Sequence, residues 1–115
     1  MRAAIDDESI EIVISPDRAR EVTTVSDHTA SGFIAIAAAT RQSFGELVVV
    51  PGLTIAGTDS RHYARIAGNA YRFNPFAVER PDLPRLHGSN ERISVENLRR
   101  AMTFYSALLL SLGNQ

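Results

Sequence analysis

The sequence predicts an α/β fold, a partial sheet with flanking helices, and three observations support this prediction. Apolar residues recur at helical spacing over about residues 29–44 and again after Ser94. A short, wholly apolar run at residues 47–50 follows the first of these helices, which is typical of a strand buried on both faces of such a sheet. The elements follow in the order strand, helix, strand, short helix, strand, long loop and helix, an alternation that favours the α/β class.

The N-terminal region contains two candidate strands. Isoleucines at positions 10, 12 and 14 alternate with other residues, which predicts a strand over residues 10–14 that a Ser-Pro-Asp turn ends. Residues 22–25 are rich in Val and Thr, so they form either a second strand or an extended linker.

The helix at about residues 29–44 is predicted from its start, its periodicity and its end. Residues 26–29 offer several N-cap side chains, and Phe33, Thr40 and Phe44 recur at helical spacing. Gly45 is a natural stop because glycine accepts the backbone conformation that ends many helices.

The C-terminal half holds shorter elements and one long helix. Residues 60–66 predict a short helix with Asp59 or Ser60 as its cap, and residues 70–73 predict a strand. Three prolines predict a long loop over residues 74–85. Ser94 is the expected N-cap of a last helix that Gly113 ends. Its apolar stripe is predicted to be Leu98, Met102, Tyr105, Leu109 and Leu112, widened by Ala101 and Leu108.

Composition narrows the classes of function. The chain has 115 residues, enough for one small domain with a modest core. Its net charge is −1, so it lacks the basic excess of a nucleic-acid or anionic-membrane binder. There is no Cys, so any metal must be held by His and carboxylate side chains. No signal-peptide pattern opens the chain, which favours a cytoplasmic location, and the longest apolar stretch is too short to span a bilayer.

His87 is the best candidate metal ligand. It precedes Gly88, which would let backbone approach a ligand closely, and it lies just before a predicted helix. In one interpretation His87 binds a metal while Asn90 and Glu91 orient it. In the other, His87 is structural or merely solvated, and residues 89–91 only cap and charge the helix start. Both interpretations are compatible with the sequence.

A second polar cluster, Gly57-Thr58-Asp59-Ser60-Arg61, follows the predicted buried strand. Ligands bind at the carboxyl ends of strands in open α/β sheets, so this 57–61 loop is a candidate binding site. It could equally be a capped turn that an Asp59–Arg61 pair stabilises. His28 and His62 are weaker candidates, and a zinc site normally needs three or four protein ligands. Spacing alone therefore predicts no complete zinc site.

Three stretches, taken together, resemble a known family. They are Val50–Tyr63, Tyr71–Pro75 and His87–Ile93, in that order. The chain is similar to the C-terminal end of the aminoacylase and carboxypeptidase family of di-zinc metallopeptidases. The branch it resembles most is the Gly-X carboxypeptidase and N-fatty-acyl-amino-acid hydrolase type, and the resemblance runs from about Phe33 to Leu112.

The resemblance implies a catalytic α/β domain interrupted by a small lid domain that also dimerises the enzyme. Residues 1–28 would end the lid/dimerisation domain, with residues 10–14 as its last strand. Residues 29–115 would be the C-terminal part of the zinc peptidase catalytic domain. In this family two zinc ions hydrolyse an amide next to a free carboxylate, in a dipeptide or an N-acyl amino acid.

The resemblance also assigns roles to individual residues. His87 would be the last zinc ligand, with Asn90 and Glu91 around it. The substrate site would be bordered by Gly57, Thr58, Asp59 and Arg61.

The chain departs from the family pattern because the other ligand motifs and the general base have no counterpart in it. One side of a di-metal site cannot activate a bridging water. We therefore expect the chain alone to be inactive. Its expected partners are the missing N-terminal half and a second copy of the enzyme, which would associate through the lid domain. The alternative hypothesis is a non-catalytic assembly module that pairs through an exposed sheet edge.

Overall fold

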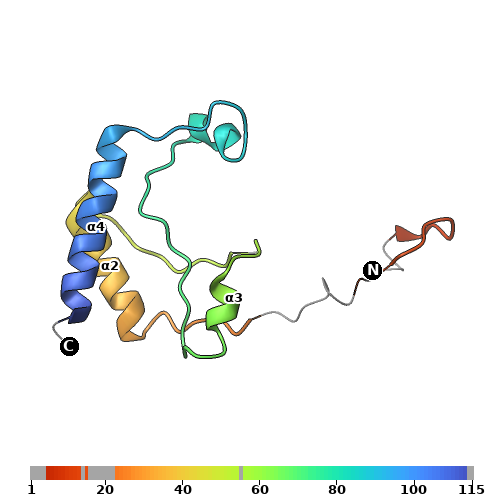
Figure 1. Cartoon of the computed structure of the whole chain (residues 1–115), viewed down its shortest axis with the longest axis horizontal. Coiled ribbons are helices and arrows are strands. Elements are labelled where there is room, and N and C mark those ends of the chain that lie inside the picture. The colour runs from red at the N-terminus through yellow and green to blue at the C-terminus, as the bar shows by residue number, and fades with distance from the viewer. Residues whose placement is uncertain (1–4, 14, 16–22, 55, 114–115) are drawn as a thin grey trace.

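The computed structural model describes residues 5–13, 15, 23–54 and 56–113, and its secondary structure over those ranges is helical. The elements are α2 (Ser31–Phe44), α3 (Ser60–Tyr63), the 3-10 helix η1 (Arg80–Arg85) and α4 (Val95–Gly113) (Figure 1). The short helix predicted for residues 60–66 is thus present but shorter. The long loop predicted for residues 74–85 contains η1.

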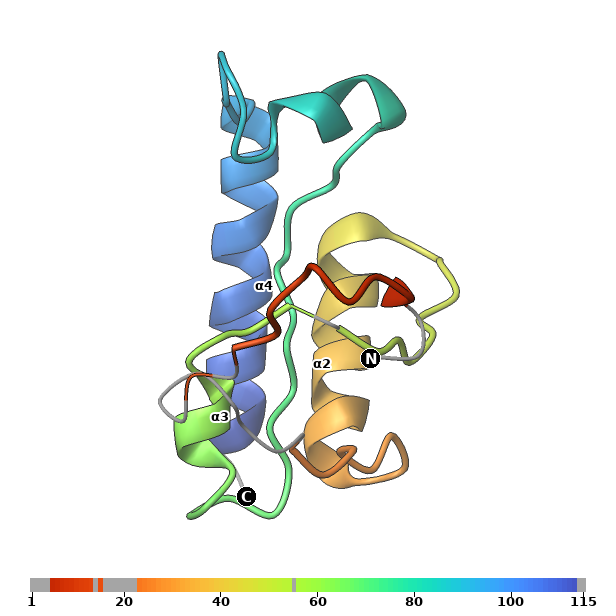
Figure 2. The same ribbon diagram turned by 90° about the vertical axis from the view of Figure 1, so that its right-hand side faces the viewer.

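The core lies where α2 and α4 pack side by side in antiparallel directions (Figures 1 and 2). Phe104 fills it and is only 2% exposed. The other buried residues of the two helices are small: Ala37, Ala39, Thr40 and Ala101. Small side chains let the two helices approach closely around one aromatic ring, which is how a modest core reaches high packing density.

Both long helices begin or end on local signals that the sequence predicts. Ser94 caps α4, because its Oγ accepts a hydrogen bond from the Asn97 amide at 3.1 Å. Gly45 ends α2 with φ 84° and donates its amide to the Arg41 carbonyl at 2.8 Å. These two boundaries are confirmed.

Before α2, a side-chain turn replaces the predicted N-cap. The Asp27 carboxylate accepts hydrogen bonds from the Thr29 amide and hydroxyl, both at 2.7 Å. These bonds, the amide first, hold the pKa of the Asp27 carboxyl below its usual range. The residue at the N-cap position itself, Ala30, makes no side-chain cap.

The extended segment 70–77 lies along the helix pair (Figure 2). At one end the Tyr71 hydroxyl donates to the Asp27 carbonyl at 2.6 Å. In the middle Phe73 stacks on Phe104, with ring centroids 5.0 Å apart. At the other end the Asn97 side chain bonds the backbone of Ala77 in both directions, at 2.9 and 2.7 Å. This segment therefore joins the start of α2 to the start of α4.

The predicted partial α/β sheet is wrong, because the residues that the structure describes contain no strand. The described parts of the predicted strands 10–14, 22–25, 47–50 and 70–73 are extended or turn segments, while Ile14 and Val22 lie outside the described residues.

No sheet forms because the described extended segments make no series of backbone hydrogen bonds with one another. Between residues 26 and 70 a side chain takes their place: the Ser26 hydroxyl accepts from the Ala70 amide at 2.9 Å and donates to its carbonyl at 3.1 Å. Val48, predicted to be buried on both faces, is 85% exposed. Apolar sequence favours a strand only where a neighbour accepts its hydrogen bonds.

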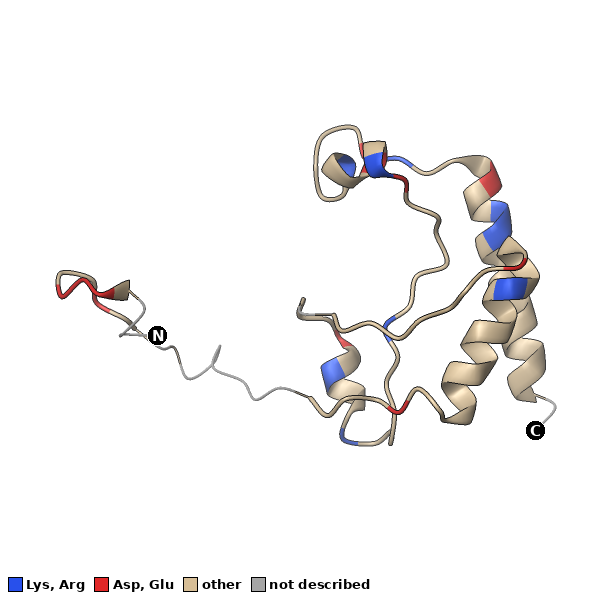
Figure 3. Ribbon diagram, turned by 180° about the vertical axis from the view of Figure 1, so that it is seen from behind, with Lys and Arg blue, Asp and Glu red and all other residues tan. Residues whose placement is uncertain are grey.

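The predicted apolar stripe of α4 is only partly buried. Of its members Ala101 is buried, beside Phe104, which the prediction did not include. The outer stripe, as we call it, is exposed: Leu98, Met102, Tyr105, Leu109 and Leu112. The helix after Arg100 carries no charge and is apolar on both sides, so periodicity alone cannot choose between them (Figure 3).

The chain exposes a large surface for its size. Its accessible surface is 9862 Å², whereas a folded monomer of 12.6 kDa exposes about 6,200 Å². Among the helices of the described residues, none has the length and apolar character needed to cross a bilayer.

Replacing the central aromatic ring tests the core. We expect Phe104→Ala to lower the free energy of unfolding by about 3–5 kcal/mol, because it removes a buried ring and leaves a cavity. Met102→Ala on the outer stripe is the control, since Met102 is 65% exposed. Urea unfolding measures both variants. Equal effects of the two substitutions would contradict the assigned core.

Candidate functional site

His87 follows η1 in an unusual backbone conformation. Its φ is 56°, in the left-handed region, and its side chain is exposed. Positive φ is uncommon for a non-glycine residue, but His, Asn and Asp adopt it several times more often than other residues do. The turn presents the imidazole outward in this conformation.

Gly88 explains how the turn is imposed. Its amide donates to the Arg85 carbonyl at 2.9 Å. A Cβ at this position would overlap the Pro84 carbonyl oxygen. The space that the glycine leaves is thus filled by the chain's own backbone rather than by a ligand.

Asn90 and Glu91 are exposed, and neither hydrogen-bonds to His87 in the described part of the chain. Asn90 also has positive φ, 65°, which asparagine tolerates better than most residues. Their predicted role of orienting His87 stays a prediction.

The 57–61 loop is closed by hydroxyl groups. The Thr58 and Ser60 hydroxyls lie 2.7 Å apart, and the Ser60 amide donates to the Thr58 hydroxyl at 3.3 Å. Asp59 precedes α3 without a side-chain cap. Arg61 donates its Nε to His62 Nε2 at 3.3 Å. Asp59 and Arg61, both within the described residues, form no ion pair, so the predicted stabilising pair is not formed. Both side chains are exposed to solvent.

Arg72, which the motifs did not single out, reaches this loop from the extended segment 70–77. Its Nε donates to the Ser60 hydroxyl at 2.6 Å, and its Nη1 donates to the carbonyls of Thr54 and Ala56 at 2.9 and 3.4 Å. The sequence does carry one signal for it, namely a single charge between two aromatic residues.

The structure does not bring the two candidate clusters together. The turn after η1 lies near the top of both views, whereas helix α3 lies near the bottom (Figures 1 and 2). The described residues also contain no group of three or more His, Asp or Glu side chains that could hold a metal. His87 therefore stands as one candidate ligand without companions in this part of the chain.

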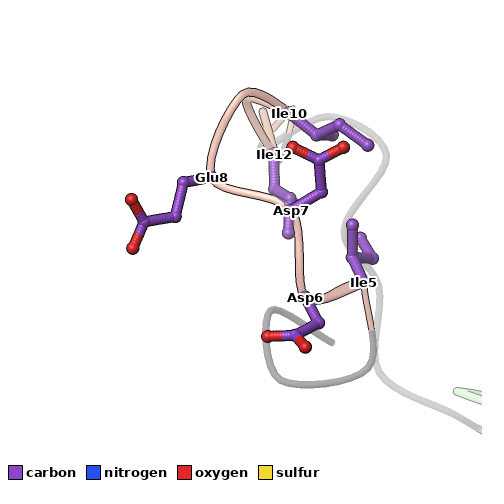
Figure 4. Close-up of a pocket in the computed structure, with 6 residues that line it drawn as sticks. All are labelled: Ile5, Asp6, Asp7, Glu8, Ile10 and Ile12. Atoms are coloured by element: carbon purple, nitrogen blue, oxygen red, sulfur yellow. The ribbon is translucent and has the colours of Figure 1, made fainter.

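A separate pocket lies in the N-terminal turn, lined by Ile5, Asp6, Asp7, Glu8, Ile10 and Ile12 (Figure 4). Its three carboxylates point in different directions (Figure 4). The Asp7 carboxylate is occupied by the Ser9 hydroxyl and amide, at 2.6 and 2.9 Å, which lowers the pKa of Asp7. The local turn accounts for this arrangement.

Comparison with known proteins first gives the class of protein to which the chain is similar. The chain is homologous to part of proteins named as carboxypeptidase S-like and as N-fatty-acyl-amino acid synthase/hydrolases, with 32–42% identity over partial coverage. The predicted resemblance to this branch is confirmed. No family model matches the chain, and no solved structure matches it.

Particular relatives illustrate the coverage. Probable carboxypeptidase S-like 2 of Dictyostelium discoideum is 36% identical over an alignment of 105 positions, which covers 84% of this chain and 20% of that protein. The N-fatty-acyl-amino acid synthase/hydrolase of Mus musculus is 42% identical over 80 residues, 69% of this chain and 16% of that protein. The chain thus spans about a fifth or less of the length of these relatives.

The turn around His87 can be tested through Gly88. We expect Gly88→Ala to shift the amide signals of residues 84–90 in the NMR spectrum and to lower the melting temperature, because the new Cβ overlaps the Pro84 carbonyl. Gly52→Ala is the control, since a Cβ there meets nothing within 4 Å. An unchanged turn in Gly88→Ala would refute the close contact.

Proposed function

We propose that this chain is the C-terminal segment of a zinc-dependent peptidase or amidohydrolase that cleaves an amide next to a free carboxylate. The observation that carries the proposal is its homology to carboxypeptidase S-like proteins and N-fatty-acyl-amino acid synthase/hydrolases. The names of these relatives favour a dipeptide or an N-acyl amino acid as substrate.

The described residues do not by themselves fit a zinc ion. Zinc sites use three or four protein ligands, whereas this part of the chain offers one candidate imidazole and no metal-competent group of three. We therefore assign no reaction step to the metal here. His87 is proposed as one ligand of a site that residues outside this chain complete. Its exposed side chain supports this role, because groups from outside this chain can reach the imidazole.

Arg61 is proposed to bind the free carboxylate of the substrate. Its guanidinium is exposed and has no carboxylate partner among the described residues. A planar guanidinium presents paired N–H groups that match a carboxylate bidentately. Gly57, Thr58 and Asp59 would border the same pocket, with Gly57 allowing close approach of the substrate.

The outer stripe of α4 favours a second role, association with the remaining part of the hydrolase. The five residues of this stripe are 47–68% exposed, and a contiguous exposed apolar patch is typical of a protein interaction site. The relatives are at least about five times longer than the matched region, so the proposed partner is their N-terminal portion. The predicted exposed sheet edge plays no part, because the described residues form no sheet.

Removing His87 from the complete enzyme tests the metal assignment. We expect His87→Ala to lower zinc content and hydrolysis together, the latter by more than about 100-fold, since even groups that only orient ligands are worth about 10- to 100-fold. Metal analysis and initial rates measure this. His28→Ala, an exposed histidine outside both candidate clusters, should keep both properties. Full zinc occupancy and turnover in His87→Ala would refute the assignment.

Mixing tests the proposed partner. We expect the chain alone to retain no zinc after dialysis and to hydrolyse no N-acyl amino acid, because one imidazole cannot hold the ion tightly. Addition of an N-terminal portion that carries the other ligands should restore both. Light scattering then follows the mass of the assembly. A stable, metal-free homo-oligomer that ignores the N-terminal portion would instead support a non-catalytic assembly module.

A further inference from the structure

Arg72 makes all the long-range hydrogen bonds of the loop that carries Arg61. Among the described residues, every hydrogen bond that joins residues 54–61 to a residue more than four positions away is donated by Arg72. The remaining bonds of the loop are local, between neighbours such as Thr58 and Ser60. Within the described residues, the loop is therefore hydrogen-bonded to the rest of the chain through one side chain.

The acceptors of Arg72 lie on both sides of the loop. The carbonyls of Thr54 and Ala56 precede Gly57, and the Ser60 hydroxyl follows Asp59. One planar guanidinium thus spans the two ends of the turn. A fork of fixed geometry can hold two chain segments at a set separation, which a flexible ammonium cannot do.

Arg72 is itself held firmly by its neighbours. Tyr71 is tied to the start of α2 through its hydroxyl and lies 6.0 Å from the Phe33 ring, centroid to centroid. Phe73 stacks on the buried Phe104 of α4. Arg72 is half-buried between these two anchors. The contacts connect the loop, through one residue, to the most rigid part of the structure.

The charge of Arg72 is not neutralised by a carboxylate within the described residues. Its Nε and Nη1 donate to one hydroxyl and two carbonyls, which are all neutral acceptors, so a positive charge remains beside the loop. This charge favours an anionic substrate near Arg61 without contacting it, since half-buried charges are screened less than exposed ones.

We infer that Arg72 is a positioning residue that sets the conformation of the 57–61 loop and thereby the recognition of the substrate carboxylate by Arg61. The inference rests on the proposed function for its consequence in substrate binding. We call the three hydrogen bonds from Arg72 to residues 54, 56 and 60 the clamp. The clamp is inferred from contacts within this chain alone and does not depend on the proposed function.

The first experiment measures the clamp in the chain itself. Arg72→Met removes the guanidinium but keeps an apolar stem. Arg65→Met is the matched control, because Arg65 is exposed in the turn after α3 and makes no hydrogen bond among the described residues. We expect amide hydrogen exchange of residues 57–62 to quicken at least about tenfold in Arg72→Met, as expected for freed local opening, and to stay unchanged in Arg65→Met. Equal exchange in the two variants would overturn the inference.

The second experiment measures substrate binding in the complete enzyme. We expect Arg72→Met to raise KM for substrates with a free carboxylate about tenfold or more, while kcat and zinc content stay within about twofold, because small displacements of a binding group weaken binding steeply. Substrates whose carboxylate is blocked as an amide should show no added loss. A parallel fall in kcat, zinc content and stability would overturn the inference in favour of a general structural role.

A double-mutant cycle with Ser60 separates the clamp from a long-range charge effect. Ser60→Ala removes one acceptor of Arg72, so its effect on KM should be smaller and should largely vanish in the Arg72→Met background. Additive effects would overturn the clamp. If the complete wild-type enzyme hydrolyses neither class of substrate, the proposed function fails, and the exchange experiment still decides whether Arg72 positions the loop.

Discussion

The packing of α2 against α4 around Phe104 is the interaction on which the rest of the described structure depends. The small residues of α2 allow the close approach, and the 70–77 segment is laid along the pair by Phe73 and Asn97. Arg72 belongs to this segment, so the 57–61 loop is held by the same core. A loop without its own apolar anchor can be ordered in this way only if a rigid neighbour supplies the contacts.

The candidate site is divided between two regions with different physical character. The turn at His87 is shaped by its own backbone, through the positive φ of His87 and the contact between Gly88 and Pro84. The 57–61 loop is shaped from outside by Arg72. Neither region brings three metal-competent side chains together within the described residues. Both regions present polar side chains to solvent.

The exposed apolar surface accounts for both incorrect predictions about the fold. A strand exists only when a neighbouring chain segment accepts its backbone hydrogen bonds, and residues 47–50 have none among the described residues. The outer stripe of α4 was predicted to be core because a regular apolar stripe normally meets a partner. The stripe is exposed for a similar reason. Apolar periodicity identifies a helix face that is able to pack against a partner, but among the described residues α4 packs against α2 through its other face.

The sequence by itself determined the start of α4, the end of α2 and the homology. Ser94 caps α4 and Gly45 ends α2 because capping is decided within a few residues of chain. The tertiary structure alone decided which face of α4 packs, that segments rich in Val remain unpaired, and that Arg72 holds the 57–61 loop. These features depend on contacts between residues far apart in the chain, and no local pattern specifies which of two apolar faces, or which arginine, will find a partner.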